Sequence, residues 1–331
     1  MTVLLTCAGS RVDIVRAFQA ALADGPHTGR VLISDAGEAS PTRFEADGIV
    51  ELPMVEDPGY LDAVLEVCRR EEVRALLPLT DLDPVLLAEA APALAPLGTR
   101  VFLPDPDIAL GCQDKWRCHE MLTAAGLPSP PTWLAGSVER ADLPYPVLLK
   151  PRMGFAARHI YRAADPEELA FFERYSPLES VYQQALDGTE FSTDTLGDLD
   201  GRTLGAIPRS MMQAKGGEQV KGESLDDPQL VELAVRVVET LGLRGPSCIQ
   251  CFRKDGVIQG ITDINTRFGG AFPLPLAAGG DYPELIVRMA AGETPESRVG
   301  RHTPGIVMTR FLAETILQRT PDGLRAVTGG R

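Results

Sequence analysis

Short runs of apolar residues alternate, over the first hundred residues, with stretches in which apolar positions recur every three or four residues. The apolar runs predict buried strands, and the three-to-four spacing predicts amphipathic helices. We expect strands near residues 3–6, 31–33, 49–52, 75–78 and 100–102, and helices near 12–22, 58–70 and 84–94. Such alternation is typical of a doubly wound parallel sheet with helices on both faces. We therefore predict an α/β domain over residues 1–107.

The pattern changes near residue 105, where prolines cluster. Two turns, Asp200-Gly201 and Asp255-Gly256, predict β-hairpins. We expect helices near 113–125, 232–241 and 282–291, and strands near 146–151, 180–186, 190–196, 248–253, 257–265 and 306–311. This order predicts an α+β module in two parts, residues 108–185 and 186–331, with a loose tail after Thr320.

Composition narrows the class of protein. The formal net charge of −14 makes a nucleic-acid partner unexpected, because phosphate backbones repel an acidic surface. No segment approaches the ~20 consecutive apolar residues of a membrane span. The apolar first residues are followed at once by Arg11 and Asp13, with no basic segment before them, so we predict no signal peptide. The six scattered cysteines then favour reduced thiols in a cytoplasmic protein.

Two kinds of site are disfavoured. Cys248 and Cys251 form a Cys-x-x-Cys pair, but no second pair of ligands at matching spacing completes a zinc site. The first strand-to-helix turn carries one glycine, Gly9, where a dinucleotide fingerprint needs three. The carboxyl ends of the predicted parallel strands carry Ser10-Arg11, Asp35 and Thr80-Asp81. The expected walls of a substrate pocket are Ser10, Arg11 and Asp81, together with Gly269-Gly270.

Two lysines are candidate phosphate ligands. Lys115 opens the first helix after the sheet domain, and Lys150 ends an apolar strand that precedes the loop 152–159. Backbone N–H groups of such a loop can form an anion-binding nest. A solvated Lys115 and a Lys150 that extends its ammonium to the surface are the alternatives.

A strand near residue 183 is a candidate nucleotide hinge. Gln183 and Gln184 lie where a strand edge offers a carbonyl and an amide to adenine. Glu190 follows after a turn, and an ionised carboxylate can accept from two ribose hydroxyls. A surface glutamate after a turn is the alternative.

The second hairpin carries candidate metal ligands. Side chains alternate along a strand, so Asp263 and Asn265 point to one face, and Gln250 on the neighbouring strand can face them. Three oxygen ligands suit Mg²⁺ held together with phosphate oxygens. Arg267 shares that face, where a guanidinium can stabilise charge during phosphoryl transfer. A polar, solvent-facing hairpin is the alternative.

Taken in order along the chain, these features resemble the ATP-grasp superfamily. Asp114-Lys115 with Leu122–Pro128 is similar to the first helix of the family, and Pro146–Pro151 is similar to the strand with its second lysine. Asp263–Gly270 resembles its Glu-x-Asn-Pro-Arg metal segment. The chain looks closest to the branch similar to one half of the carbamoyl phosphate synthase large subunit, where a glutamine precedes the Glu–Asn pair. The resemblance covers nearly the whole chain.

The resemblance implies a role for each candidate residue. The nucleotide-binding set that it implies is Lys115, Lys150, Arg158, His159, Gln183, Gln184, Leu186 and Glu190. The metal set, for one or two Mg²⁺ with Mn²⁺ as an alternative, is Gln250, Asp263 and Asn265. The catalytic set is Arg267, which would steady the transferred phosphoryl group, with Arg209 and Lys221 from a mobile basic loop near the substrate.

Three positions depart from the family pattern. The phosphate loop, residues 152–159, holds one glycine, so Arg158 or His159 would supply charge there. The metal glutamate is Asp263 here, one methylene shorter, and the proline is Thr266. These changes motivate an alternative function, a non-catalytic ATP-binding regulator on the same fold.

The activity that the resemblance implies is that of an ADP-forming ligase. ATP would phosphorylate a substrate carboxylate, and an amine would displace phosphate to give an amide, while a closing lid excludes water. The expected partners are a small carboxylate, an amino acid in the first place, and a small amine, and a homodimer is one assembly that fits. A kinase and an AMP-forming ligase are the alternative reaction types.

Overall fold

The first hundred residues fold as the predicted parallel sheet. The computed structural model describes residues 1–154, 158–215 and 218–327. The first sheet has the strand order β3-β2-β1-β4-β5, and its neighbouring strands are parallel. The strands are β1 (Thr2–Thr6), β2 (Arg30–Ile33), β3 (Gly48–Ile49), β4 (Val73–Pro78) and β5 (Arg100–Val101). The connecting helices are α1 (Val12–Asp24), α2 (Tyr60–Arg70) and α3 (Pro84–Leu94), with 3₁₀ turns η1 (Pro41–Phe44) and η2 (Ala95–Leu97).

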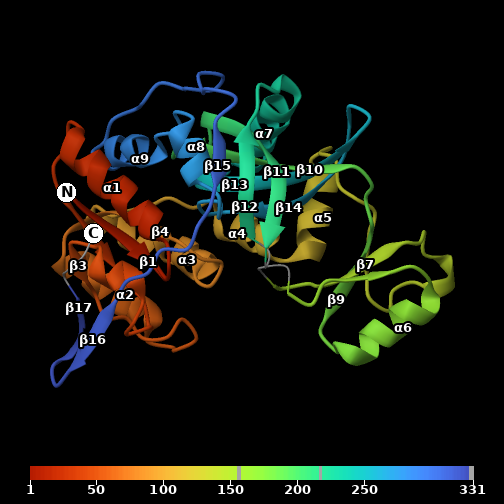
Figure 1. Cartoon of the computed structure of the whole chain (residues 1–331), viewed down its shortest axis with the longest axis horizontal. Helices are drawn as coiled ribbons and strands as arrows, with labels where there is room; N and C mark the ends of the chain where they lie inside the picture. The colour runs from red at the N-terminus through yellow and green to blue at the C-terminus, as the bar shows by residue number, and fades with distance from the viewer. Residues whose placement is uncertain (155–157, 216–217, 328–331) are drawn as a thin grey trace.

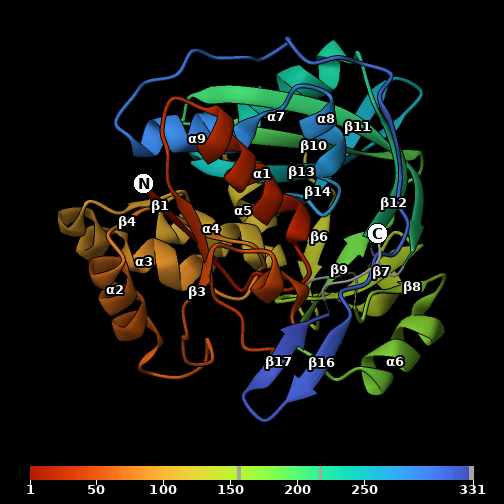
Figure 2. The ribbon, with the colours of Figure 1, turned by 60° about the vertical axis from the view of Figure 1, so that its left-hand side comes forward.

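Both faces of this sheet are buried, because successive side chains of a strand point to opposite faces. Val3 and Leu5 pack with α1 and with α9 (Tyr282–Ala290), a helix from the far end of the chain, whereas Leu4 packs with α2 and α3. Figures 1 and 2 show α1 and α9 side by side. The doubly wound sheet is confirmed, and the C-terminal part of the chain helps to cover it.

A smaller sheet forms a separate lobe (Figure 1). It has the order β6-β9-β7-β8, with antiparallel pairs. Its elements are β6 (Thr132–Leu134), η3 (Arg140–Asp142), β7 (Val147–Pro151), β8 (Tyr161–Ala163), α6 (Pro166–Tyr175) and β9 (Ser180–Gln184). Leu149, Leu169 and Tyr182 belong to its own small core. We call this lobe, residues 132–184, the lid.

A six-stranded antiparallel sheet completes the module, with the order β14-β13-β10-β11-β12-β15. Its strands are β10 (Thr189–Gly197), β11 (Thr203–Lys215), β12 (Glu218–Ser224), β13 (Gly245–Lys254), β14 (Val257–Asn265) and β15 (Val307–Thr309). The helices after the first domain are α4 (Pro106–Gln113), α5 (Lys115–Ala124), α7 (Pro228–Leu241) and the short α8 (Pro273–Ala277). Ile249 and Ile264 belong to one apolar cluster with Leu230 and Val237 of α7. Since side chains alternate, Gln250 and Asn265 point to the opposite face.

The helix predicted over residues 113–125 is confirmed as α5, and a separate helix, α4, ends directly before it at Gln113. Asp114 interrupts them because its backbone is extended, and its carboxylate caps α5 by accepting from the N–H groups of Trp116 and Arg117. Leu122 on α5 belongs to the same apolar cluster as residues of α7 and not to the core of the lid, although α5 also contacts β6. The predicted unit boundaries, 1–107, 108–185 and 186–331, stay predictions.

Two segments that were predicted to be irregular form β-hairpins. The stretch from Arg209 to Lys221, expected as a mobile loop, lies in β11 and β12, and its residues 216–217 fall outside the described ranges. The tail after Thr320, expected to be loose, includes β17 (Gly323–Ala326), which pairs with β16 (Leu317–Thr320). The reason is the turn Pro321-Asp322-Gly323, in which Gly323 has a φ of +113°.

None of the described helices has the length and apolar character that crossing a membrane requires.

Candidate active site

The start of α5 and the end of β7 are tied together. Lys115 donates from its backbone N–H to the Arg152 carbonyl at 3.0 Å and from Nζ to the Gly154 carbonyl at 3.1 Å. Arg152 Nε donates to Asp114 Oδ1 at 3.1 Å. Burial raises the pKa of Asp114, but the hydrogen bonds from Arg152 and the helix N-terminus outweigh it and hold the pKa below its usual value. The first predicted lysine therefore lies at the entrance of the predicted phosphate loop.

Lys150 is buried inside the lid. Its side chain is only 7% exposed, and Nζ donates to Gln183 Oε1 at 2.7 Å. Gln183 in turn donates to Thr132 Oγ1 at 3.1 Å. Burial lowers the pKa of Lys150 to about 8, and the nearby Asp263 carboxylate only partly offsets this. Among the described residues this ammonium forms no ion pair with a carboxylate, an arrangement that suits an incoming phosphate.

Two rows of side chains cross the site face of the C-terminal sheet. The strand register places Gln250 opposite Asp263 and Ser192, and it places Cys248 opposite Asn265 and Asp194. Opposite residues of neighbouring strands share a face. The three predicted metal ligands therefore lie together, as the alternation along the hairpin predicted.

The amide groups of these ligands are oriented by carboxylates. Gln250 Nε2 donates to Glu190 Oε1 at 3.0 Å, and Asn265 Nδ2 lies 3.3 Å from Asp263 Oδ2. Both amide nitrogens are thereby engaged, so the acceptors beside the Asp263 carboxylate are the amide oxygens, and that of Asn265 also accepts from Arg267 Nη2. Burial raises the pKa of Glu190, and the Lys150 ammonium partly offsets this. Glu190, predicted to bind ribose, thus contacts the metal set in this structure.

The donor set fits the implied Mg²⁺ in its chemistry. Within the described ranges, no group of three or more His, Cys, Asp or Glu is arranged to hold a metal. The set consists instead of one carboxylate, Asp263, and the amide oxygens of Gln250 and Asn265, with Glu190 alongside. Such oxygens suit a Mg²⁺ ion that takes its remaining ligands from phosphate and water.

Arg267 is held by the N-terminal domain. Its Nε and Nη2 donate to the two oxygens of Asp81 at 3.0 and 2.7 Å, and Nη2 also donates to Asn265 Oδ1 at 3.1 Å. Arg11 donates to the carbonyls of Phe268 and Gly269, the next two residues. Burial would lower the pKa of Arg267, but Asp81 outweighs it, so the pKa stays above its usual value and the guanidinium stays charged. Of the expected wall residues at the sheet edge, Arg11 and Asp81 therefore contact the predicted metal segment or the loop after it.

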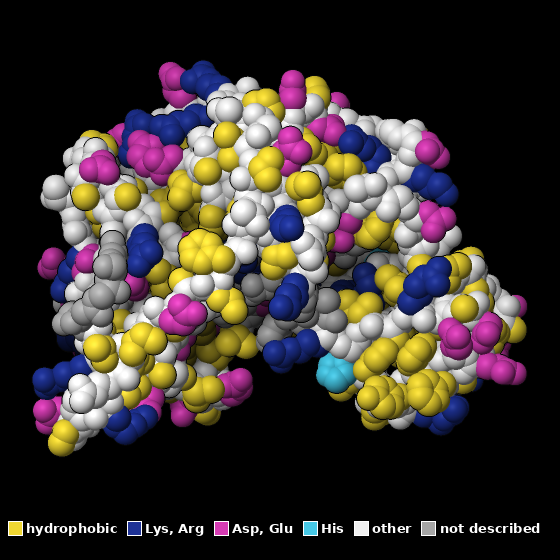
Figure 3. Space-filling view, viewed as in Figure 1, with side chains coloured by type: hydrophobic (Ala, Val, Ile, Leu, Met, Phe, Trp, Pro, Cys, Tyr) yellow, Lys and Arg dark blue, Asp and Glu magenta, His cyan; other side chains and the backbone are white. Residues whose placement is uncertain are grey.

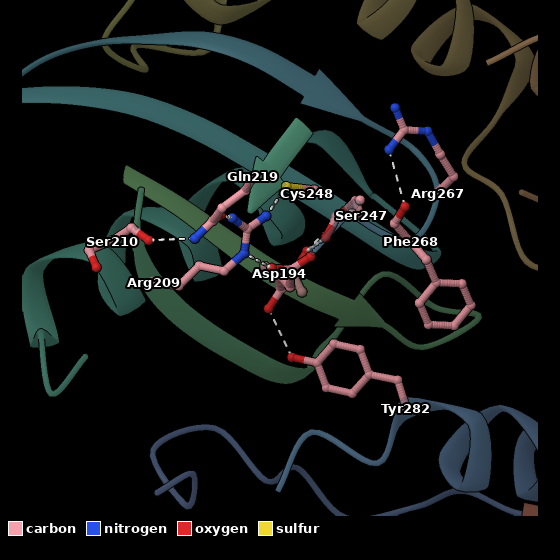
Figure 4. A network of polar contacts seen from close by, with 12 residues as sticks. Asp194, Arg209, Ser210, Gln219, Ser247, Cys248, Arg267, Phe268 and Tyr282 are labelled. Atoms are coloured by element: carbon pink, nitrogen blue, oxygen red, sulfur yellow. Dashed lines mark hydrogen bonds and ion pairs between the residues drawn. The ribbon is translucent and has the colours of Figure 1, made fainter. Parts of the chain in front are cut away.

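Arg209 and Lys221 do not occupy a loop, contrary to the prediction. Arg209 lies in β11, is 3% exposed, and donates from Nε to Asp194 Oδ2 at 2.6 Å. Figure 4 shows its guanidinium enclosed by Asp194, Gln219 and Cys248. Burial would lower the pKa of Arg209, but Asp194 outweighs it. Arg209 therefore does not reach a substrate directly in this arrangement, whereas Lys221 lies exposed on β12.

The remaining predicted nucleotide residues lie on or next to the lid. Gln184 ends β9 and Leu186 follows it, both half-buried. Arg158 and His159 are exposed, and His159 Nδ1 lies 3.4 Å from Tyr161 Oη and from Ser176 Oγ. Residues 155–157 of the predicted phosphate loop are outside the described ranges. Figure 3 shows Lys and Arg side chains gathered along the recess between the lid and the body.

Sequence reasoning missed two contributors to this site. Asp194 lies among polar residues of β10, so no change of pattern distinguishes it from its neighbours. Gln219 is 4% exposed but stands in a stretch that reads as a polar loop. Asp81 was predicted as a wall, yet its pairing with Arg267 joins residues 186 positions apart and leaves no signal in the sequence.

Comparison with known families agrees with this architecture. Residues 178–311 match the family described as ATP-grasp in the biosynthetic pathway with Ter operon, and residues 3–102 match the PylC-like N-terminal domain. The chain contains an ATP-grasp domain. The match spans the C-terminal sheet with Gln250, Asp263 and Asn265, so the superfamily resemblance is confirmed. The carbamoyl phosphate synthase branch stays a prediction.

Curated relatives of this chain include two ligases. It is 35% identical over 100 residues to D-alanine–D-alanine ligase of Halorhodospira halophila. This match covers 27% of this chain and 31% of that protein. It is 25% identical over 223 residues to a putative D-alanine–D-lactate ligase of Streptomyces coelicolor. This match covers 60% of this chain and 62% of that protein. The chain thus spans less than two thirds of the length of either relative.

A solved structure shares the fold. N5-carboxyaminoimidazole synthetase from Staphylococcus aureus, complexed with ADP, superposes with a TM-score of 0.74 at 14% identity, over 94% of this chain and 82% of that one. The ATP-grasp fold, with its parallel N-terminal sheet and two antiparallel sheets, is therefore established for this chain.

Proposed function

We propose that this chain is an ATP-dependent, ADP-forming ligase that joins a small carboxylate, in the first place an amino acid, to an amine. The observation that carries the proposal is the meeting of Lys150, Glu190, Asp263 and Arg267 around one recess, with Lys115 at its entrance. The two ligase relatives support the reaction type.

The nucleotide would lie between the lid and the C-terminal sheet. Lys115 and Lys150 supply positive charge for the phosphates, because Lys150 lies in β7 just before the loop and Lys115 Nζ donates to the Gly154 carbonyl of that loop. The backbone of Gln184 and Leu186 would hold adenine, and Glu190 would accept from ribose. Arg158 and His159 are exposed on the lid and could add charge to the phosphate loop.

Mg²⁺, when bound by Gln250, Asp263 and Asn265, would neutralise charge on the phosphates. Arg267 stands beside this set and is held in place by Asp81. A preorganised guanidinium stabilises negative charge as it develops, without reorganising during the reaction. One or two ions, and Mn²⁺ in place of Mg²⁺, are both compatible with this donor set.

The reaction consists of two transfers. A carboxylate oxygen of the first substrate takes the γ-phosphoryl group of ATP, which yields an acyl phosphate and ADP. The amine nitrogen then attacks the acyl carbon, loses a proton, and expels inorganic phosphate to leave an amide. Arg267 is placed to stabilise charge in both steps, and closure of the lid would keep water from the acyl phosphate.

The test is phosphate release from MgATP in the presence of a panel of L- and D-amino acids and hydroxylamine. Acid-dependent phosphate release with a hydroxamate product is the expected result. Tight MgATP binding with no turnover for any acid would instead favour a non-catalytic regulator. A phosphorylated product without amine dependence would indicate a kinase, and pyrophosphate release would indicate an AMP-forming ligase.

A further inference from the structure

A buried ion pair lies beside the proposed metal set without belonging to it. Asp194 and Arg209 are 1% and 3% exposed, and their contact joins Arg209 Nε to Asp194 Oδ2 at 2.6 Å. Asp194 shares a row with Asn265, and Arg209 stands opposite Ser192 in the row of Gln250. Both charges are therefore embedded in the site face of the sheet, where neither is open to a substrate (Figure 4).

The pair is poorly suited to stabilising the fold. Removing two charges from water costs several kcal/mol per ion, and the cost is recovered only when the remaining polar atoms are satisfied. Here Asp194 Oδ1 is buried without a hydrogen-bond partner among the described residues. A pair of apolar side chains would often serve stability as well or better. The contacts that Arg209 and Asp194 make with the rest of the chain indicate another role.

At one end the pair anchors the β11–β12 hairpin. Arg209 Nη1 donates to Gln219 Oε1, and Gln219 Nε2 donates to the carbonyls of Ser210 at 2.7 Å and Lys221 at 3.2 Å. These contacts lie beside the bulges of β11, where the register between the two strands shifts. A Cβ at Gly222 would lie 1.7 Å from Gln219 Nε2, so a glycine there leaves the space that the amide occupies.

At the other end the pair touches the loop after the metal segment. A Cβ at Gly269 would lie 2.2 Å from Asp194 Oδ1, so the carboxylate packs directly against the backbone of this glycine. Tyr282 also donates to the Asp194 carbonyl at 2.8 Å, and its ring contacts Phe272, which contacts Phe268. Arg267 immediately precedes Phe268.

We propose that Asp194, Arg209 and Gln219 are positioning residues, which set the β11–β12 hairpin against the loop 267–270. The chain of contacts runs from Lys221 on the hairpin through Gln219, Arg209 and Asp194 to Gly269. It therefore couples the placement of Lys221 to that of Arg267 across the recess. The expected effect of this coupling on kcat rests on the proposed ligase function. The expected effect on the stability of the β11–β12 hairpin does not.

Two variants separate positioning from stability. Asp194→Leu with Arg209→Met removes both charges together, so that no uncompensated charge is left in the interior. Gln219→Glu keeps an acceptor for Arg209 but loses the two donations to Ser210 and Lys221. Asp198→Asn with Arg202→Met is the matched control, because this ion pair lies at the far end of β10 and β11, at the turn between them.

Four quantities are measured for each variant: the melting temperature, the Kd for MgATP, hydrogen–deuterium exchange of the β12 amides, and kcat for phosphate release with the amino-acid panel and hydroxylamine. For both site variants we expect a melting temperature and a MgATP Kd close to those of the unmodified protein. We expect the β12 amides to exchange at least tenfold faster and kcat to fall at least tenfold. The control variant should change neither exchange of β12 nor kcat.

Unchanged exchange and unchanged kcat in both site variants would show that the pair is only part of the core, and would overturn the proposal. If the double variant does not fold, exchange of the β12 amides and kcat in Gln219→Glu alone decide whether these are positioning residues. If the unmodified protein releases no phosphate with any acid, the ligase function fails, and the exchange of β12 still decides whether the hairpin is anchored by this chain of contacts.

Discussion

In the N-terminal sheet, polar side chains with candidate roles stand at the carboxyl ends of strands, whereas in the C-terminal sheet they fill the middle of one face. Leu4, Leu5 and Leu77 are fully buried in the first sheet. Ser192, Asp194 and Arg209 are almost as deeply buried in the second. Side chains that are about equally buried are therefore apolar in the first sheet and polar or charged in the second.

The difference follows from what covers each sheet. The parallel sheet has helices on both faces, so both faces of each strand must be apolar, and only the strand ends are free for chemistry. The C-terminal sheet packs α7 against one face, whereas its other face carries the polar groups beside Leu196 and Ile207, which share a core with α9. A site can then spread over several strands, at the cost of burying charges that need partners.

The largest effect is expected in the apolar sheet. Leu77→Ala should lower the free energy of unfolding by about 2–5 kcal/mol, because it removes a fully buried side chain and leaves a cavity. Urea unfolding measures it. Leu82→Ala, at an exposed leucine nearby in the sequence, is the control and should change stability by no more than about 0.5 kcal/mol. Equal free energies of unfolding for the two variants would contradict the claim that the buried leucines stabilise the first sheet.

Arg267→Ala tests the polar face where we place the chemistry. We expect kcat to fall ~10²–10³-fold, the usual effect of removing a preorganised donor to developing charge, with little change in the Kd for MgATP. The measurement pairs phosphate-release kinetics with equilibrium nucleotide binding. Arg16→Ala, which removes an exposed surface ion pair with Glu45, is the control. A loss confined to MgATP affinity would show that Arg267 binds nucleotide instead.

Lys150→Met tests the contribution of the lid. Hydrogen bonds to charged groups contribute about 1.5–3 kcal/mol, so MgATP affinity should fall roughly 10- to 100-fold. Isothermal titration calorimetry measures it, with Lys254→Met at an exposed ion pair as the control. An unchanged Kd would remove Lys150 from the phosphate site.

The pH dependence of nucleotide binding should report the same lysine. Burial lowers the pKa of Lys150 to about 8, so the charged form is present below that value and is lost as the pH rises through it. The affinity for MgATP should therefore fall above pH 8, by no more than about tenfold per pH unit. In Lys150→Arg the guanidinium stays charged, and this alkaline loss should disappear. A profile that is the same in both proteins would assign the titration to another group.

The smallest effect is expected for Ser192→Ala. Ser192 Oγ is buried and has no hydrogen-bond partner among the described residues, so its removal should change stability by less than about 1 kcal/mol, toward greater stability. Thr195→Val on the same strand is the control, because Thr195 Oγ1 is 2.6 Å from Ser247 Oγ and its loss should destabilise by about 1 kcal/mol. Clear destabilisation by Ser192→Ala would indicate an undetected partner for this hydroxyl.

The sequence by itself determined the features that depend on local periodicity. Alternation of apolar strands and amphipathic helices predicted the parallel sheet, and the Asp255-Gly256 turn predicted the hairpin that brings Gln250 opposite Asp263. Both follow because the period of a strand or helix and the conformation of a tight turn depend on residues close together in the chain. The sequence also shows directly that Lys115 and Lys150 precede this hairpin along the chain.

Only the tertiary structure decided which side chains meet across elements. It joined Asp81 to Arg267, buried Arg209 against Asp194 instead of leaving it in a loop, and brought Leu122 of α5 into one apolar cluster with residues of α7. The physical reason is that these contacts depend on how whole sheets and helices pack, and not on the conformation of any one segment. A polar residue in a strand has the same local pattern whether it faces water or a buried partner.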